Sequence, residues 1–392
     1  MGSTMAEVLK AIGLMSGTSL DGIDAALLDT DGVNLAVPGP ALAVPYHPWA
    51  RAMLHDALAA ASQVTPGSPL PGAIVKAERL ITDAHCDAVR RLLSEAKLDP
   101  AQIACVGFHG QTILHRPAER RTWQIGDGQI LADSIGIPVV NEFRLADVKA
   151  GGQGAPLVPL YHQVLTRGMN LPVVVVNIGG VANVTYACAA GELIAFDTGP
   201  GNAAMDDWAL KHTGEAIDRD GKLAAAGHVD QGVLEFMLAH PMFRQPPPKS
   251  LDRFDFPMAA VQCLSAEDGA ATLTAFTAAA IAKSLEHLPQ VPHCWIICGG
   301  GRHNPVLMSE LRVRLRQKVI IAEEAGWRGD FLEAEAFAYL AVRSVKHLPL
   351  SLPSTTGVPY PMPGGRLHKP ANVSAPLYWG GGPPRSGGGG DL

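Results

Sequence analysis

Near its start the chain reads Met15-Ser16-Gly17-Thr18-Ser19-Leu20-Asp21-Gly22, a run of small and polar residues between two apolar segments, Val8–Met15 and Ile23–Leu28. Two apolar runs joined by a short loop that ends in Asp-Gly predict a β-hairpin. The pattern returns after Pro172, where Val173–Ile178 and Val184–Cys188 flank the turn Gly179-Gly180-Val181-Ala182-Asn183. The sequence therefore predicts two hairpins of the same kind, far apart in the chain.

Two further segments also form a pair. Ile103–Phe108 leads into His109-Gly110-Gln111-Thr112, and Trp295–Cys298 leads into Gly299-Gly300-Gly301. Each is predicted to be a buried strand followed by a polar, glycine-bearing turn and then a helix. This pairing indicates an internal duplication, and two similar α/β halves predict a two-lobed fold with an active-site cleft between the lobes.

Periodicity and end signals predict seven helices and two irregular segments. Ala270–Leu288 is rich in Ala and Thr and nearly uncharged, so we expect it to be buried against a sheet. Pro246–Pro257 is too rich in proline for a regular element, and Gly380–Leu392 is expected to be disordered. The other predicted helices are Ile74–Ala96, Gln129–Gly136, Asn202–Thr213, Gln231–Leu238, Asn304–Gln317 and Phe331–Leu348.

Composition narrows the class of partners. The 392 residues carry a formal net charge of −6, which gives no electrostatic footprint for nucleic acid or for an anionic membrane. No apolar stretch reaches the ~18–20 residues of a membrane span, and no secretory signal is evident. The six cysteines are scattered without a C-x-x-C pair. We therefore expect a cytoplasmic protein with reduced thiols.

The first hairpin loop has the composition of a phosphate site. Small residues let the backbone approach an anion, and exposed N–H groups with hydroxyls can surround phosphate oxygens. The loop is not a Walker A motif, because Gly-Lys-Ser/Thr is missing and a strand follows it. The alternative interpretation is an ordinary hairpin turn, and the second glycine hairpin favours the phosphate site.

Asp197 is the candidate general base. A strand-like run ends at Asp197, and Gly199-Pro200-Gly201 then leads into a helix at Asn202. A carboxylate at a strand end beside a helix N-terminus is well placed to accept a proton near a bound anion. The alternative is that Asp197 only caps the turn, a common role for aspartate.

Other polar segments leave two interpretations open. The loop Asp147–Leu157 either binds a polar ligand or is an interdomain hinge, and Gly299–Gly301 ends a buried strand where a nucleotide often lies. His109 and His115 lack the carboxylates or cysteines of a metal site, so hydrogen bonding is the favoured role. Glu333 and Glu335 begin an apolar helix, where carboxylates complement the helix dipole.

Short blocks along most of the chain, roughly residues 8–357, together resemble the anhydro-N-acetylmuramic acid kinase family. Each block is short, and their collinear order makes the resemblance specific. They are Gly13–Asp24, His109–Thr112, Gln124–Gly126, Phe143–Leu157, Asn177–Asn183, Phe196–Asn202, Pro247–Ser250, Ala271–Thr277, Gly299–Gly301, Glu333–Ala334 and Ala336–Ala338.

The resemblance implies an actin/hexokinase-like (ribonuclease H-like) fold, ATP with Mg²⁺ as cofactors, and a homodimer. It implies that a bicyclic sugar with a 1,6-anhydro bridge is opened by water and phosphorylated at O6, which gives N-acetylmuramic acid 6-phosphate in cell-wall recycling. Asp197 would be the base, and Glu333 a second acidic residue near the sugar. His109, Gln111 and Arg144 would contact the sugar.

The resemblance also assigns the ATP-binding residues. The phosphate loop would be Ser16, Gly17, Thr18, Ser19, Leu20, Asp21 and Gly22, with Asp21 also a candidate metal ligand. The nucleotide would lie against Gly179, Gly180, Asn183, Gly199, Gly201, Asn202, Gly299, Gly300 and Gly301.

The chain departs from the family pattern in two places. Glu142 stands before Phe143-Arg144 where the family often has Asp, and Gly365–Leu392 has no clear counterpart.

We predict residues 1–145 with 349–392 as the first domain, and residues 146–348 as the second. The rival functions are a kinase for an ordinary sugar hydroxyl and a nucleotide-gated binding protein, for which the chain has no room for a separate peptide-binding domain.

Overall fold

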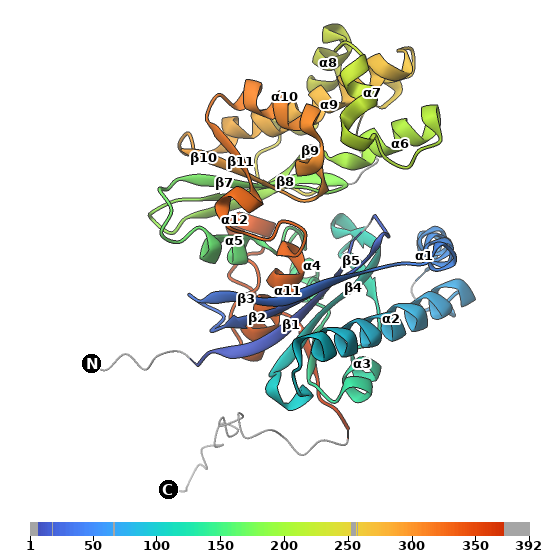
Figure 1. The fold of residues 1–392 in the computed structure, drawn as a ribbon, viewed down its shortest axis with the longest axis vertical. Coiled ribbons are helices and arrows are strands. Elements are labelled where there is room, and N and C mark those ends of the chain that lie inside the picture. Colours follow the sequence, from blue (N-terminus) through green and yellow to red (C-terminus); the bar gives the residue numbers. More distant parts are fainter. Residues whose placement is uncertain (1–6, 18, 66, 252–255, 257, 372–392) are drawn as a thin grey trace, which may run out of the picture.

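The computed structural model describes residues 7–17, 19–65, 67–251, 256 and 258–371. Over these residues the strands form two sheets (Figure 1). The first sheet has the order β12-β6-β4-β1-β2-β3, with β5 paired to β4, and the second has the order β11-β10-β7-β8-β9. The strands of the first sheet are β1 (Leu9–Ser16), β2 (Gly22–Thr30), β3 (Ala36–Pro45), β4 (Cys105–Arg116), β5 (Arg121–Ile125), β6 (Val139–Asn141) and β12 (Arg366–His368); those of the second are β7 (Val173–Ile178), β8 (Val181–Ala187), β9 (Leu193–Pro200), β10 (Cys294–Cys298) and β11 (Lys318–Ile321).

The two sheets repeat one topology. In each sheet a hairpin, β1–β2 or β7–β8, pairs antiparallel and is followed by a third antiparallel strand. The first strand of each hairpin then pairs parallel with a later strand, β4 or β10. Both predicted hairpins and the two-lobed α/β fold are therefore confirmed, and the shared strand order supports an internal duplication. Two predicted bounds are wrong: Val181–Asn183 belong to β8 and not to the turn, and β9 continues past Asp197 to Pro200, because these residues pair with one another across the two strands.

The predicted turn at His109–Thr112 is also wrong. His109–Thr112 was expected to leave the strand that ends at Phe108, but β4 continues through these residues to Arg116 and turns back as β5. The glycine in the segment explains how this is possible, because Gly110 has φ +72° and a Cβ there would lie 2.5 Å from the carbonyl oxygen of Ile125. Polar side chains thus extend a strand whose first half is apolar.

The predicted helices all occur, with shifts of a few residues at their ends. Asp127, Ser265 and Asn304 cap α3, α9 and α10 by accepting main-chain N–H bonds. The sequence analysis did not predict α1, α4, α5, α7 and α12. The α-helices are α1 (Pro48–Ala61), α2 (Gly72–Ala96), α3 (Gly128–Ile135), α4 (Leu145–Lys149), α5 (Pro159–Leu165), α6 (Asn202–Thr213), α7 (Lys222–Ala226), α8 (Gln231–Leu238), α9 (Ala266–Lys283), α10 (Pro305–Leu315), α11 (Leu332–Val345) and α12 (Pro353–Thr356).

Short 3₁₀ helices connect several elements. They are η1 (Pro100–Gln102), η2 (Pro117–Glu119), η3 (Arg219–Gly221), η4 (Pro241–Arg244), η5 (Met258–Val261), η6 (Ser284–His287), η7 (Gly300–His303) and η8 (Ala322–Ala325). Of the segment Pro246–Pro257, residues 246–251 contain no regular element, and residues 252–255 and 257 lie outside the description, as does the tail Gly380–Leu392.

The helix α11 packs against the first sheet, although it follows the last strand of the second. Close approach is possible because β1 and β4 carry glycines at the contact: a Cβ on Gly13 would lie 1.7 Å from the carbonyl oxygen of Ala334, and one on Gly107 would lie 2.1 Å from that of Phe337. In Figure 1, α4, α5, α11 and α12 lie between the two sheets. Strand β12 pairs with β6 of the first sheet. The predicted domain boundaries themselves stay a prediction.

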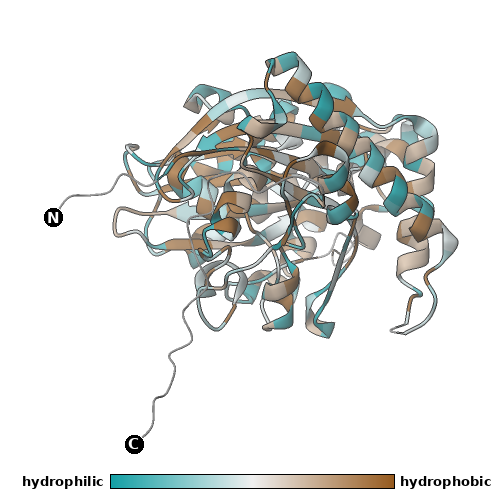
Figure 2. Cartoon of the chain, turned by 90° about the horizontal axis from the view of Figure 1, so that it is seen from below, coloured by the Kyte–Doolittle hydropathy of each residue, from teal (hydrophilic) through white to brown (hydrophobic). Residues whose placement is uncertain are grey.

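Apolar side chains form three cores. One lies between the second sheet and helices that include α9, one lies between the first sheet and α1 to α3, and one lies between the sheets around α11. The expected burial of Ala270–Leu288 is confirmed from Ala270 to Ile281, where every residue is buried, whereas the segment beyond is mostly half-buried and Glu286 is exposed. Figure 2 shows hydrophobic residues concentrated along the strands and hydrophilic residues on the outer faces of helices.

Candidate active site

A row of polar side chains crosses the second sheet. Asn183 on β8 is paired in register with Asn177 on β7 and with Asp197 on β9. Directly opposed residues of antiparallel strands project from the same face of a sheet. The row therefore places two amides and one carboxyl side by side, at the end of the sheet where β7 and β10 end.

Asp197 is buried, with 7% of its surface exposed. Its Oδ2 accepts a hydrogen bond of 2.8 Å from the main-chain N–H of Leu251. Burial raises the pKa of Asp197 to about 7, against the opposing effects of the Leu251 N–H, Arg144 and Lys249. A carboxyl that changes protonation near neutral pH can accept a proton in a reaction at that pH. The role of a turn cap does not explain this burial.

Three glycine loops meet beside this row. The main-chain N–H of Asn202 donates to Gly179 O at 2.7 Å, and that of Gly201 donates to Gly180 O at 3.0 Å. A Cβ on Gly201 would lie 2.1 Å from Gly179 O. Gly199 lies in the same loop, at the end of β9.

The third loop, Gly299–Gly301, closes against the first two. A Cβ on Gly299 would lie 2.6 Å from Ile178 O, and one on Gly300 would lie 3.3 Å from the side-chain nitrogen of Asn202. The structure therefore brings together all three segments that the sequence assigns to the nucleotide. They surround the N-terminus of α6, which begins at Asn202 without a side-chain cap. The first N–H groups of this helix, those of Asn202 and Ala203, donate to Gly179 O and Gly180 O, and the positive end of the helix dipole favours an anion bound nearby.

The first hairpin loop belongs to the other lobe. Leu20 has φ +55°, and its N–H donates to Gly17 O at 3.2 Å, so the turn between β1 and β2 is tight. Ser19 Oγ donates to Asp21 Oδ1 at 2.9 Å. Gly22 begins β2, and Thr18 lies outside the described residues.

Gln111 supports this loop from β4. Ser16 Oγ donates to Gln111 Oε1 at 2.6 Å, and Gln111 Nε2 donates to Gly17 O at 3.2 Å. Tyr46 completes the arrangement, with its hydroxyl 2.9 Å from Ser16 Oγ. Gln111, predicted to contact sugar, is buried and its amide is used to hold the Ser16–Gly22 hairpin loop.

His109 and Arg144 form a second polar pair. Arg144 donates from Nε and NH2 to His109 Nε2 at 3.1 and 3.0 Å, and from NH1 to Gly154 O at 2.8 Å. His109 Nδ1 donates to Gly110 O at 2.7 Å. Burial and the adjacent guanidinium hold the pKa of His109 well below its usual value, so this histidine is neutral. Glu333, Asp147 and Asp197 all act electrostatically on Arg144, which therefore lies among carboxylates of both lobes.

Carboxylates gather between the phosphate loop and α11. Burial, with the negative charges of Asp21, Glu333 and Asp330, raises the pKa of Asp24 to about 7. The pKa of Glu333 is also raised, by burial and by Asp21 and against the effect of Arg144. Glu333 accepts a long hydrogen bond of 3.5 Å from Asn177 Nδ2.

This acidic cluster suits a cation that arrives with a nucleotide. Within the described residues no group of three or more His, Cys, Asp or Glu side chains could hold a metal ion by itself. Mg²⁺ is usually held by one or two carboxylates together with substrate phosphates and water. Asp21, Asp24 and Glu333 supply hard oxygen donors whose mutual repulsion a cation would relieve, so the residues fit Mg²⁺.

The loop Asp147–Leu157 is tied at both ends. Asp147 accepts hydrogen bonds of 2.6 Å from Gly154 N and from Thr356 Oγ1. Gln153 Oε1 accepts a hydrogen bond of 2.8 Å from Ser250 Oγ, so the loop also contacts the segment beside Asp197. Glu142, the departure from the family pattern, has φ +53° and lies 3.8 Å from Arg366.

Sequence reasoning missed four residues around the site. Tyr46 has no local motif, and Asp24, Asn177 and Lys249 stood inside recognised blocks without a role. For Asp24 the available signal was its position two residues after Gly22 on the predicted strand, because residues two apart on a strand lie on the same face of the sheet. For Lys249 the sequence held no signal, because the residues that it contacts lie on β9 and η4 and meet it only in the folded chain.

The family model described as anhydro-N-acetylmuramic acid kinase matches residues 9–368. This chain belongs to the anhydro-N-acetylmuramic acid kinase family. The predicted resemblance and the prediction of an enzyme are thereby confirmed.

Individual relatives agree with the family assignment. The chain is 53% identical over 365 residues to the anhydro-N-acetylmuramic acid kinase of Paramagnetospirillum magneticum, which covers 92% of this chain and 100% of that one. It is also 53% identical over 363 residues to that of Rhizorhabdus wittichii, with 92% and 99% covered. Among solved structures, a ROK family glucokinase from Streptomyces griseus in complex with glucose and AMPPNP matches at a TM-score of 0.42 and 15% identity, over 84% of this chain and 98% of that one. In the described residues no helix of this kinase is long and apolar enough to cross a membrane.

Proposed function

We propose that this kinase uses ATP to phosphorylate 1,6-anhydro-N-acetylmuramic acid at O6 while water opens the anhydro bridge, and that it works in cell-wall recycling. The observation that carries the proposal is Asp197, a buried carboxyl whose pKa is raised to about 7 and which lies beside three converging glycine loops. Membership of the family supplies the substrate, since relatives at 53% identity bear its name.

The proposed reaction balances as follows. Water adds its oxygen to C1 of the sugar, and the C1–O6 bond breaks. O6 takes the γ-phosphoryl group of ATP, ADP leaves, and the proton of the water passes to Asp197. The products are N-acetylmuramic acid 6-phosphate and ADP. Asp197 is ionised in part near neutral pH, so it can accept this proton without strong acid or base.

The remaining residues bind and orient the reactants. Main-chain N–H groups of the Ser16–Gly22 loop and of the loops at Gly179, Gly199 and Gly299 would hold phosphates and nucleotide, because phosphoryl transfer depends chiefly on positioning and charge neutralisation. Arg144, held by His109, would contact the sugar, with Glu333 near it and Gln111 supporting the loop. Mg²⁺, held by Asp21, Asp24 or Glu333 with the phosphates, would neutralise charge on the transferring group.

We extend the proposal to the state of the protein in the cell. The resemblance implies a homodimer, and the scattered thiols indicate a cytoplasmic location. All six cysteines are free, as a reducing compartment requires.

The test is a coupled ATPase assay with 1,6-anhydro-N-acetylmuramic acid in ¹⁸O water. The wild type is expected to place solvent oxygen at C1 and phosphate on O6. Asp197→Asn is expected to lose roughly 10²-fold or more in kcat, whereas Asp83→Asn, which removes a surface ion pair with Arg79, is expected to match the wild type. Consumption of ATP with another sugar, and none with this one, would contradict the proposed substrate.

A further inference from the structure

The segment around Lys249 lies along β9 beside the candidate base. The N–H of Asp197 donates to Lys249 O at 3.0 Å, and the N–H of Leu251 donates to Asp197 Oδ2 at 2.8 Å. In the described part of the second sheet β9 is the outermost strand on this side. Lys249 and Leu251 therefore fix both the main chain and the carboxylate of Asp197.

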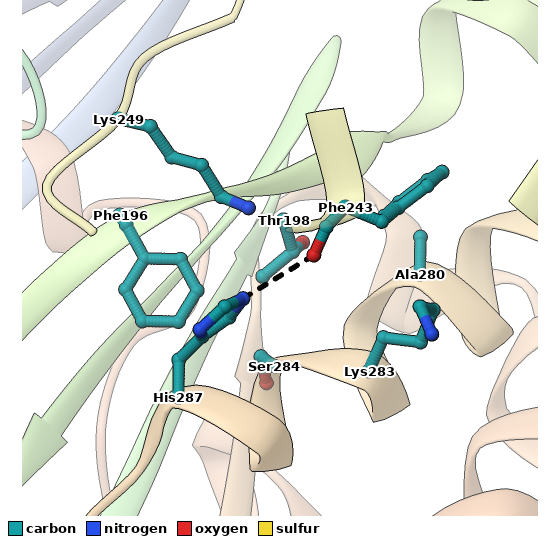
Figure 3. A pocket seen from close by; sticks show the side chains of 8 residues that line it. All are labelled: Phe196, Thr198, Phe243, Lys249, Ala280, Lys283, Ser284 and His287. Carbon is teal, nitrogen blue, oxygen red and sulfur yellow. Dashed lines mark hydrogen bonds between the residues drawn. The ribbon is translucent and has the colours of Figure 1, made fainter. Parts of the chain in front are cut away.

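The side chain of Lys249 lies on the opposite face of β9. Phe196 and Thr198, which flank Asp197 along the strand, line a small cavity there together with Lys249, Ser284 and His287 (Figure 3). Its volume is about 10 Å³, close to the space of one water molecule. Lys249 itself is 8% exposed. The cavity therefore lies behind the base, on the other face of β9 from Asn183.

The ammonium of Lys249 is held by dipoles. In the described part of the chain its hydrogen-bond acceptors are the carbonyl oxygens of Met242 and Gln245, each at 3.0 Å, and it lies 5.8 Å from the ring centroid of Phe196. Burying a cation without a close carboxylate is costly. The carboxylates that act on it at longer range are Asp197 and Glu286.

The charged groups around Asp197 act in a defined way. Arg144 faces it from the start of α4, and Lys249 lies behind it; both favour the ionised carboxylate, while burial disfavours it. On the cavity side His287 donates toward Phe243 O at 3.3 Å, and Lys283 pairs with Glu286 at 3.0 Å near the surface. Glu333 and Asp147 lie near Arg144. Lys249 is thus the buried cation on the face of β9 away from Arg144.

We propose that Lys249 is a positioning residue for the reaction: it aims the Asp197 carboxylate through the Leu251 N–H and keeps that carboxylate ionised through the field of its buried ammonium. The inference rests on the proposed role of Asp197 as the base. Lys249 touches neither water nor sugar in this role. Loss of its charge should change the pH at which the enzyme becomes active, and loss of its packing should change the activity at the plateau.

The test is the pH dependence of kcat/KM with 1,6-anhydro-N-acetylmuramic acid. Lys249→Gln keeps an amide donor for the two carbonyl oxygens but removes the charge. Without the ammonium Asp197 ionises at higher pH, so the acidic limb of the pH–rate profile is expected to move up by about one pH unit. At pH 6 the variant should then be roughly tenfold slower than the wild type, with a smaller deficit at pH 9. Lys249→Arg should keep the limb near that of the wild type. Lys283→Gln, which lines the same cavity with a cation paired near the surface, is the matched control.

Several outcomes overturn the inference. If Lys249→Gln is slower by one factor at every pH and its limb stays in place, Lys249 has only a structural role. If Lys249→Gln does not fold, Ser284→Asp tests the same field, because a carboxylate in the cavity offsets the ammonium and should also raise the limb; an unmoved limb in the folded variant then overturns the inference. Asp197→Asn is measured in parallel. If Asp197→Asn is inactive and the acidic limb of Lys249→Gln is unmoved, only this inference is refuted. If Asp197→Asn is active, the proposed role of Asp197 as the base is refuted as well.

Discussion

Arg144 donates two hydrogen bonds to one nitrogen of His109, Nε2, at 3.1 and 3.0 Å. A nitrogen that accepts from a guanidinium cannot carry a proton, so the neutral tautomer of His109 with hydrogen on Nδ1 is the one that fits. His109 in turn packs against Phe337 of α11, with ring centroids 4.6 Å apart. The position of Arg144 thus depends on β4 and on α11 together.

We expect His109→Ala to raise the KM for the sugar roughly tenfold, because a hydrogen bond to a charged group contributes about 1.5–3 kcal/mol. The effect should be the same from pH 6 to pH 9, because His109 does not change protonation in that range. His109→Gln, whose amide oxygen can accept from Arg144, should recover part of the loss. Steady-state kinetics at both pH values measure this, with exposed His55→Ala as the control. A KM effect that appears only near pH 6 would contradict a neutral His109.

Gly201→Ala is expected to weaken nucleotide binding by at least about tenfold, because the new Cβ would lie 2.1 Å from Gly179 O and the glycine loops would have to separate. Titration calorimetry with a non-hydrolysable ATP analogue measures the affinity. The matched control is Gly72→Ala, where a Cβ meets nothing within 4 Å. Wild-type affinity in Gly201→Ala would show that the nucleotide does not use these loops.

Two carboxylates on one helix are expected to behave differently. Glu335 accepts from Tyr161 at 2.7 Å and from Arg328 at 2.5 Å, so Glu335→Gln should lower the melting temperature and leave kcat nearly unchanged. Among the described residues the Glu333 side chain has one hydrogen bond, the long contact with Asn177, so Glu333→Gln should leave the melting temperature nearly unchanged and lower kcat/KM by roughly 10–10²-fold. Calorimetry and kinetics on both variants decide; a loss of activity confined to Glu335→Gln would reverse the assignment.

Asp24→Asn is expected to stabilise the ligand-free protein above neutral pH. The pKa of Asp24 is about 7 in the folded state against an ordinary 3.8, so between these values the folded chain retains a proton that the unfolded chain has lost. The contribution of Asp24 to stability is thus largest at low pH and is lost as the pH rises through 7. The melting temperature of Asp24→Asn should exceed that of the wild type by a few degrees at pH 8.

The gain in Asp24→Asn should shrink toward pH 5, where the wild-type carboxyl is already protonated. Asp83→Asn, on the surface of α2, should show no such trend. Saturating Mg²⁺ with ATP analogue should favour the wild type over Asp24→Asn if Asp24 holds the cation. Equal stability of both proteins at pH 8 would contradict the raised pKa.

Local sequence determined much of the fold, because its signals act between near neighbours. Apolar runs separated by Ser16–Gly22 and by Gly179–Gly180 require hairpins, and glycines at Gly13 and Gly107 permit the close packing of α11. The segments Asn202–Thr213 and Gln231–Leu238 were bounded correctly from their end signals alone. The strand through His109–Thr112 was not, because its partner β5 compensates for polar residues that would otherwise indicate a turn.

By itself, the sequence determined most of the strands and the two glycine hairpins, and it singled out Asp197, Arg144 and the three glycine loops proposed to bind the nucleotide. Only the tertiary structure decided their chemistry. The pKa of Asp197 is set by burial, by the Leu251 N–H, by Arg144 at the start of α4 and by Lys249 in the segment that lies along β9. Gln111 supports the phosphate loop because β1 and β4 are adjacent strands. Electrostatic fields and hydrogen bonds depend on distances in space, and long-range packing sets those distances while local propensity does not.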